Sequence, residues 1–170
     1  MEYFISIAVH NQHETTLRCL RYIAKHSPKD TMVVIYDNAS KPSLFDWLLS
    51  YGLLGSRIGD PYCYIVEDGL PLKFHFAKSN DGYIEAHNHT AKIFLETDAQ
   101  YFVVLNNDTE VCSGWLEAMR AKIDAGASQV GILREGFGNR LDPSGFGEYQ
   151  SELAKAEYCE GSAFMMSRTA

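Results

Sequence analysis

Four polar segments, each placed directly after an apolar run, carry the side chains of this sequence that could do chemistry. They are Asn11, Asp37-Asn38, Asn80-Asp81 and Asn106-Asn107-Asp108. Hard divalent cations prefer carboxylate oxygen, and Mg²⁺ or Mn²⁺ often takes one or two protein carboxylates together with the phosphates of a substrate. We therefore interpret Asp108 as a metal ligand and the other segments as the surroundings of a bound nucleotide.

The predicted strands before these segments explain how they would come together. Tyr101 to Leu105 is an apolar, β-favouring run, which is typical of a strand buried on both faces. Parallel strands share a direction, so the loops after them converge at one edge of the sheet, where ligands bind in open α/β folds. Alone, Asn11 or Asn80 is typical of a turn or a helix cap, whereas the four segments together favour a ligand site.

Strands and helices are predicted to alternate along the chain. The predicted strands cover 3–9, 32–36, 62–66, 73–77, 101–105 and 129–133. Helices are predicted to start at Glu14 and stop at Pro28, to follow caps at Ser43 and Ser113, and to cover 84–96 with an inner side of Ala91, Ile93, Phe94 and Leu95. This order predicts an α/β fold with a mostly parallel central sheet and helices on both faces, in a single domain over 1–170.

Composition narrows the class of protein. The net charge of −7 and the lack of a basic block argue against nucleic acid as a partner. The four cysteines are scattered without a CxxC pair, as in reduced cytosolic proteins. No apolar run approaches the ~20 residues of a membrane span, and the first residues lack the basic region of a signal peptide. We therefore expect a cytoplasmic protein without a membrane span.

Four blocks of sequence carry a family resemblance. They are Ile5-Ser-Ile-Ala-Val-His-Asn11, Val34-Ile-Tyr-Asp-Asn-Ala-Ser40, Asn80-Asp-Gly82 with Asn88, and Val103-Val-Leu-Asn-Asn-Asp-Thr109. In order and spacing they resemble family-2 glycosyltransferases of the GT-A fold, a Rossmann-like architecture that binds nucleotide-diphospho-sugars. The tail Gly161-Ser-Ala-Phe-Met-Met-Ser-Arg168 is similar to the strand that lines the acceptor side in that family.

The resemblance implies a binding role for each matched position. The implied nucleotide-binding residues are His10, Asn11, Asp37, Asn38, Asn80, Gly82, Asn88, Asn106 and Asn107. Among them, Asp37 would hydrogen-bond the base. Asp108 would hold Mg²⁺ or Mn²⁺ against the diphosphate, where the ion stabilises the departing nucleoside diphosphate. The implied reaction moves a sugar from a UDP-, GDP- or dTDP-linked donor to a hydroxyl of a glycan, lipid or protein, with inversion.

Two positions depart from the family pattern. Asn106 stands where the metal motif has its first acidic residue, so a neutral group replaces one carboxylate. The family's general base, an acidic residue in a Glu-Asp pair well after the acceptor-side strand, has no match, and Glu160 is the nearest stand-in for an otherwise unknown catalytic residue. We therefore expect a domain that lacks the usual C-terminal segment, with Phe164-Met165-Met166 covered by a partner or by self-association.

Other readings remain open at this point. A nucleotidyltransferase would share the metal carboxylate but normally needs a glycine-rich phosphate loop, and neither GxxxxGK[ST] nor GxGxxG is present. A non-catalytic module that binds a nucleotide sugar or a partner would explain the unmatched base. A zinc site at His10 and His13 or at His87 and His89 is disfavoured, since His87 and His89 cannot share one helical face.

Overall fold

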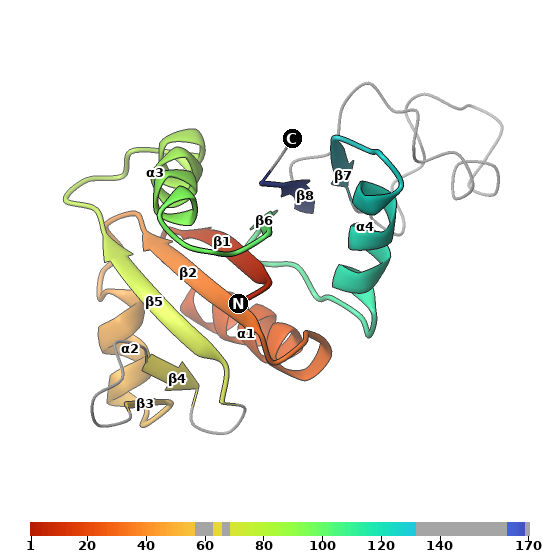
Figure 1. Ribbon diagram of the computed structural model, residues 1–170. Helices are drawn as coiled ribbons and strands as arrows, with labels where there is room; N and C mark the ends of the chain where they lie inside the picture. Colours follow the sequence, from red (N-terminus) through yellow and green to blue (C-terminus); the bar gives the residue numbers. More distant parts are fainter. Residues whose placement is uncertain (57–62, 66–68, 132–162, 169–170) are drawn as a thin grey trace, which may run out of the picture.

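The computed structural model describes residues 1–56, 63–65, 69–131 and 163–168 (Figure 1). Within these residues, eight strands form one sheet in the order β3-β4-β5-β2-β1-β6-β8-β7. The strands are β1 (Tyr3–Val9), β2 (Thr31–Asp37), β3 (Leu54–Ser56), β4 (Cys63–Ile65), β5 (Pro71–Phe76), β6 (Tyr101–Leu105), β7 (Gln129–Gly131) and β8 (Ala163–Ser167).

The centre of the sheet is parallel and its two edges are antiparallel. Strands β5, β2, β1 and β6 run in one direction, and β3, β4, β7 and β8 pair antiparallel at the edges. Parallel neighbours require crossover connections, and helices supply them here. The carboxyl ends of the four parallel strands therefore lie at the same edge of the sheet, as the sequence predicts for an α/β fold.

Four helices in the described part of the chain cover the two faces (Figure 1). They are α1 (His13–His26), α2 (Leu44–Ser50), α3 (Tyr83–Leu95) and α4 (Trp115–Asp124). Buried residues of α1, α2 and α4 join one apolar cluster with the sheet. Phe94 of α3 joins a second cluster on the opposite face. The helices are thus on both faces, which confirms the predicted layering.

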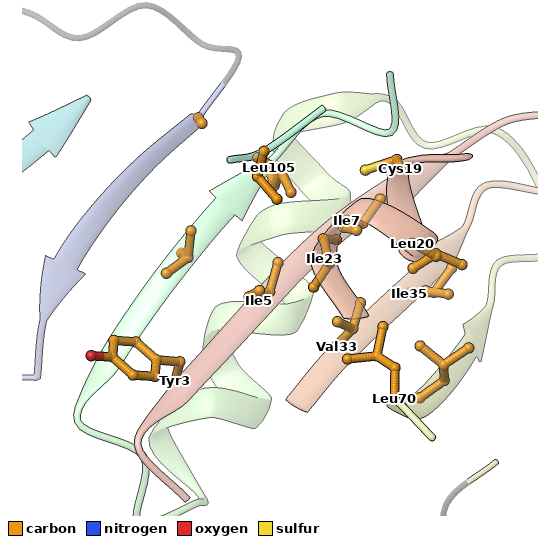
Figure 2. Packing of buried hydrophobic residues seen from close by; sticks show 14 of the residues in the cluster. Tyr3, Ile5, Ile7, Cys19, Leu20, Ile23, Val33, Ile35, Leu70 and Leu105 are labelled. Carbon is orange, nitrogen blue, oxygen red and sulfur yellow. The ribbon is translucent and has the colours of Figure 1, made fainter. Parts of the chain in front are cut away.

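The first face is an apolar core built by alternation along the strands. Tyr3, Ile5 and Ile7 of β1 point to this side and are almost fully buried in one cluster that also contains Leu20 and Ile23 of α1 (Figure 2). Each buried side chain of this size contributes about 1.5–3 kcal/mol relative to leaving it exposed. This face therefore carries most of the apolar burial of the described residues.

The second face mixes aromatic and polar groups. Phe4, Phe94 and Phe102 pack ring against ring, with centroids 5.3 to 5.7 Å apart. Ser6 is also fully buried on this face, where it contacts α3. At the far end of α3, the Arg168 guanidinium donates hydrogen bonds to the carbonyls of Phe94 and Thr97. Arg168 therefore ties the end of β8 to the C-terminus of α3.

Most predicted elements are found within one or two residues of their predicted bounds. The strands 3–9 and 101–105 are found as predicted. Ser43 caps α2, since its side chain accepts a hydrogen bond from the Asp46 amide at 3.1 Å. The short strand β3 was not predicted. The glycine-rich stretch 135–150 and Glu160 lie outside the described residues.

Two predictions about helices are wrong. Ser113 does not cap α4: Gly114 takes the cap position with φ 79°, a conformation that glycine adopts without strain, and no side-chain hydrogen bond caps this helix. On α3, Phe94 is buried and Ala91 and Ile93 are partly buried as predicted, but Leu95 is 65% exposed, and the helix also buries Ala86, His87 and Thr90. The apolar residues of α3 did not identify its whole buried side, because two of the buried positions, His87 and Thr90, are polar.

The apolar end of the chain is covered largely within the chain itself. Ala163 and Met165 of β8 are buried in the larger cluster. Phe164 and Met166 are partly buried against the smaller cluster around Phe94. Their burial therefore does not require the partner or the self-association that the sequence led us to expect, and both stay predictions.

Candidate functional site

The loops after β1, β2 and β5 are joined by hydrogen bonds that centre on Asn38. Its backbone amide donates to the Val9 carbonyl and its own carbonyl accepts from His10 Nδ1, both at 2.7 Å. Its side chain accepts from the Asp81 amide and donates to the Gly82 carbonyl, both at 3.2 Å. Asn38 is only 4% exposed. It therefore fixes three of the four predicted loops relative to one another.

Asp37 is turned inward. Its side chain is 1% exposed, and its two carboxylate oxygens accept hydrogen bonds from the amides of Ser40, at 2.8 Å, and Leu44, at 2.7 Å. Hydrogen bonds to a charged group contribute about 1.5–3 kcal/mol each. Asp37 thus holds the turn after β2 and the first turn of α2, and direct contact between Asp37 and a base stays a prediction.

The backbone of the first two loops is strained. Asn11, Gln12 and Ala39 have φ of 58°, 56° and 59°, in the left-handed region that non-glycine residues rarely occupy. Hydrogen bonds hold this conformation: the Asn11 amide donates to Ser40 Oγ at 2.8 Å, and Asn11 Oδ1 accepts from the Lys41 amide at 3.1 Å. Strained residues of this kind cluster at ligand sites, which makes this corner a candidate binding surface.

The hydrogen bond of His10 fixes its tautomer. A carbonyl oxygen can only accept, so Nδ1 must carry the proton that it shares with Asn38. With the proton on Nδ1 alone, Nε2 is an acceptor, on a side chain that is exposed at the carboxyl edge of the sheet. His10 can therefore accept a hydrogen bond from a ligand hydroxyl.

The loop between β5 and α3 forms the next part of the rim. Asn80 is exposed, and its Oδ1 accepts from the Gly82 amide at 3.1 Å. Gly82 precedes α3 with φ 86° and ψ 173°, a conformation that favours glycine. Asp81 accepts from the hydroxyls of Tyr36 and Ser79. Asn88 is exposed on the second turn of α3.

The three polar residues after β6 have three different surroundings. Asn107 Nδ2 donates to Thr16 Oγ1 of α1 at 3.0 Å. Asn106 Oδ1 is buried and has no hydrogen-bond partner among the described residues, while the Asn106 carbonyl accepts from Cys19 Sγ at 3.6 Å. Asp108 is exposed. The neighbouring asparagines therefore differ: one is held by α1 and the other presents an acceptor without a donor.

Electrostatics agree with a carboxylate-bearing loop next to α1. Burial raises the pKa of the Cys19 thiol to about 12, and the nearby carboxylates of Asp108 and Glu110 add to the rise. A thiol with such a pKa stays protonated at neutral pH, so Cys19 is a packing residue and not a nucleophile. Glu110 pairs with Arg18 of α1 at 2.8 Å. Asp108 is exposed to solvent.

The donor set fits a divalent ion that is shared with a phosphate. The described residues contain no group of three or more His, Cys, Asp or Glu side chains that could hold a metal by themselves. One exposed carboxylate, Asp108, and one carboxamide oxygen without a donor, Asn106 Oδ1, match the one or two ligands that Mg²⁺ or Mn²⁺ takes beside substrate phosphates. The histidines face other ways: His13 Nε2 donates to the Pro42 carbonyl, and His87 bonds Ser6.

Sequence reasoning missed several residues that shape this edge. Thr16 bonds the Asn107 side chain, and Ser40 bonds the Asn11 amide. His87 of α3 is buried and bonds Ser6 of β1. A serine inside the apolar run 3–9 was the one visible signal, because a buried polar side chain needs a partner. No helix in the described part of the chain is long and apolar enough to cross a membrane.

Comparison with known proteins gives a likeness in fold. Neither a family model nor a curated protein matches this sequence. Among solved structures, Staphylococcus aureus TarS 1-349 matches with a TM-score of 0.60 at 19% identity, over 84% of this chain and 38% of that chain. TarS in complex with UDP-GlcNAc matches with a TM-score of 0.60 at 18% identity, over 82% of this chain and 37% of that chain.

A second protein gives the same result. The mannosyltransferase PcManGT from Pyrobaculum calidifontis, in complex with GDP-Man and Mn²⁺, matches with a TM-score of 0.67 at 15% identity, over 99% of this chain and 45% of that chain. This chain therefore spans less than half the length of these structures. The likeness establishes an α/β Rossmann-like fold of the kind found in GT-A-type glycosyltransferases.

Proposed function

We propose that this chain binds a nucleotide-diphosphate sugar at the carboxyl edge of its sheet and takes part in glycosyl transfer to a hydroxyl acceptor. One observation carries the proposal: Asn38 joins the loops after β1, β2 and β5 by hydrogen bonds at the carboxyl edge of the sheet. The polar end of β6 lies at the same edge, because β6 is the parallel neighbour of β1. The neighbours in fold support it, since TarS was solved in complex with UDP-GlcNAc and PcManGT in complex with GDP-Man.

Each residue of this edge has a role in the proposal. The strained corner at Asn11 and the Nε2 of His10 contact the nucleoside, and Asp37 fixes the turn after β2, whose Ser40 bonds the Asn11 amide. Asp108 would hold Mg²⁺ or Mn²⁺ for the diphosphate, with Asn106 as a weaker, neutral ligand. When bound, the ion supplies Lewis-acid stabilisation of the leaving nucleoside diphosphate. Asp108 contributes the single protein charge to that ion.

The stereochemical course and the acceptor follow from the family resemblance alone. We propose inversion by single displacement, in which a carboxylate within hydrogen-bond reach removes the proton of the acceptor hydroxyl. Glu160 stays the candidate for that base and lies outside the described residues. A binding module without turnover is the second candidate, because no counterpart of the family's Glu-Asp base has been identified in this sequence.

Calorimetric titration tests the proposal. UDP, GDP, dTDP and their sugars are added to the protein with and without Mn²⁺, and at least one nucleotide is expected to bind more tightly with the ion. Asp108→Ala is expected to abolish the effect of Mn²⁺, while Asp98→Ala, which removes an exposed carboxylate before β6, leaves it intact. Unchanged Mn²⁺-dependent affinity in Asp108→Ala would sink the metal assignment.

Turnover assays separate the two candidates. Release of nucleoside diphosphate from the donor with Mn²⁺ and a panel of hydroxyl acceptors indicates a transferase. Tight binding of a nucleotide sugar without turnover over that panel favours the binding module. Preference for a nucleoside triphosphate over every diphosphate sugar would instead point to a nucleotidyltransferase.

A further inference from the structure

A buried polar relay lies between β1 and α3. It consists of Ser6, His87 and Thr90, whose side chains are 0%, 7% and 0% exposed. Ser6 Oγ lies 2.7 Å from His87 Nδ1 and also bonds Thr90 Oγ1. Thr90 Oγ1 in turn donates to the His87 carbonyl at 3.0 Å. The three side chains therefore form one closed set of hydrogen bonds inside the protein.

The protons of this relay can be assigned from its geometry. The His87 carbonyl can only accept, so the Thr90 hydroxyl proton is used there. Thr90 Oγ1 must then accept from the Ser6 hydroxyl, and Ser6 Oγ must accept from His87 Nδ1. The imidazole is thus held as the Nδ1–H tautomer, and its Nε2 atom is a lone-pair acceptor.

That acceptor has no donor. His87 Nε2 is buried without a hydrogen-bond partner among the described residues. Burial lowers the pKa of His87 to about 4, so the ring stays neutral at pH 7. Its Nε2 atom therefore carries no proton and remains an acceptor. Buried polar atoms are nearly always paired, so an oriented acceptor without a donor calls for an explanation.

A second acceptor of the same kind lies on the same face of the sheet. Ser6 is the register partner of Val104, and Phe102 and Val104 pack in the cluster on the α3 side. Asn106 is the next residue of this parity, so its side chain leaves the end of β6 toward α3. Its Oδ1 is also buried without a partner. Two unpaired acceptors therefore belong to the carboxyl half of the β1–β6 pair.

A partly exposed aromatic side chain packs against the relay. The Tyr83 ring packs edge-on against the His87 imidazole, with centroids 4.3 Å apart, and Tyr83 is itself 43% exposed. Tyr83 is the first residue of α3 and follows Gly82 on the rim of the proposed site. Rotation of one partly exposed side chain is fast, on the scale of picoseconds to nanoseconds. Our proposal requires that the ligand displace the Tyr83 ring from His87.

We propose that His87 Nε2 accepts a hydrogen bond from a hydroxyl group of the bound nucleotide sugar. The proposal rests on the proposed function and adds a binding residue to it. A polyhydroxylated ligand is the chemistry that fits, because each hydroxyl supplies a neutral donor to a neutral acceptor. The hydroxyls come from the ribose or from the transferred sugar, which share this chemistry.

Nitrogen NMR of the histidine side chains tests the proposal on the unaltered protein. In the free protein, His87 is expected to show a protonated Nδ1 and an unprotonated Nε2, assigned by comparison with a variant that lacks it. UDP and UDP-GlcNAc are then added with Mg²⁺. A shift of the Nε2 signal with UDP identifies the ribose hydroxyls, and a shift with UDP-GlcNAc alone identifies the sugar. Either result supports the proposal.

Two substitutions give a second measurement. Asparagine places an amide near Nδ1 only, so His87→Asn keeps the bond to Ser6 and loses the outer acceptor. Glutamine reaches the Nε2 position, so His87→Gln keeps that acceptor and loses the bond to Ser6. We expect His87→Asn to weaken binding about two- to tenfold, as for one neutral hydrogen bond, and His87→Gln to reduce stability more than affinity. His26→Asn, in the last turn of α1, is the control.

The outcomes separate this proposal from the function on which it rests. If calorimetry shows nucleotide-sugar binding while the His87 Nε2 signal does not move with any ligand, the hydroxyl-acceptor role is wrong and the proposed function stands. If affinity follows stability in both His87 variants, the residue is structural only. If the parent protein binds no nucleotide or nucleotide sugar, both proposals fail together.

Discussion

The two faces of the central sheet bury different kinds of side chains. The face under α1, α2 and α4 holds the larger cluster, which is built of hydrophobic residues (Figure 2). The face under α3 holds a smaller aromatic cluster next to the buried relay of Ser6, His87 and Thr90. Both faces are built from the same strands by simple alternation. The difference indicates that apolar burial on the first face supplies most of the folding stability, whereas the second face also buries polar side chains in fixed orientations.

The largest expected effect lies on the apolar face. Leu20 is fully buried between α1 and the sheet, so Leu20→Ala leaves a cavity and is expected to lower the free energy of unfolding by about 2–5 kcal/mol. Urea unfolding followed by circular dichroism measures the loss. Lys25→Ala, an exposed position on the same helix, is the control. A loss below about 1 kcal/mol in Leu20→Ala would contradict the claim that the face under α1 supplies most of the folding stability.

The α3 face is expected to respond to acid. His87 has a folded pKa of about 4 against 6.5 when unfolded, so the unfolded chain binds more protons between these values. Stability is therefore complete above about pH 6.5 and falls as the pH drops toward 4, at about 1.4 kcal/mol per pH unit and by roughly 3 kcal/mol in all.

Comparison with His87→Asn isolates this contribution. Burial also lowers the pKa of His75, with smaller contributions from His89 and Lys73, so the parent protein has a second group of the same sign. Unfolding is measured by urea at several pH values, and the variant is expected to have a shallower slope between pH 6.5 and 4. Identical slopes in parent and variant would mean that His87 is not buried as a neutral ring.

Asp37 is the exception that sharpens the comparison. Its position in β2 places it after Val33 and Ile35 on the apolar face, yet it is a buried charge. Asp37→Asn removes the charge that accepts from the amides of Ser40 and Leu44, and a loss of about 1.5–3 kcal/mol is expected. Hydrogen exchange of those two amides should rise more than that of the β1 amides. Equal protection in both proteins would argue against this role.

The smallest expected effect comes from the relay itself. Ser6→Ala leaves the His87 Nδ1–H without an acceptor, and we expect a loss of about 1–2 kcal/mol in unfolding free energy. Ser128→Ala, at an exposed position, is the control. A double-mutant cycle with Thr90→Ala should show coupling, since both substitutions break one set of hydrogen bonds. Additive effects would show that the relay does not act as a unit.

Much of the fold could be predicted because the signals are local. An apolar run such as Tyr101–Leu105, followed by a polar turn, specifies a buried strand and its end within a few residues. The cap at Ser43 is equally local, since its partner is the amide three residues on. The Gly114 cap was mispredicted because a left-handed backbone conformation leaves no pattern of apolar residues in the sequence. The exposure of Leu95 was missed because α3 buries polar residues, so its buried face does not follow the spacing of its apolar residues.

The sequence by itself determined the order of strands and helices and the polar ends of the parallel strands, because apolar period and turn chemistry act over neighbouring residues. Only the tertiary structure decided what each polar residue does. Asn107 meets Thr16 across 91 positions of sequence, and Ser6 meets His87 across 81. Hydrogen-bond partners so far apart are chosen by how α1 and α3 pack on the sheet. The residue type alone therefore does not tell which of two neighbouring asparagines finds a hydrogen-bond partner, Asn107, and which keeps an unpaired side-chain oxygen, Asn106.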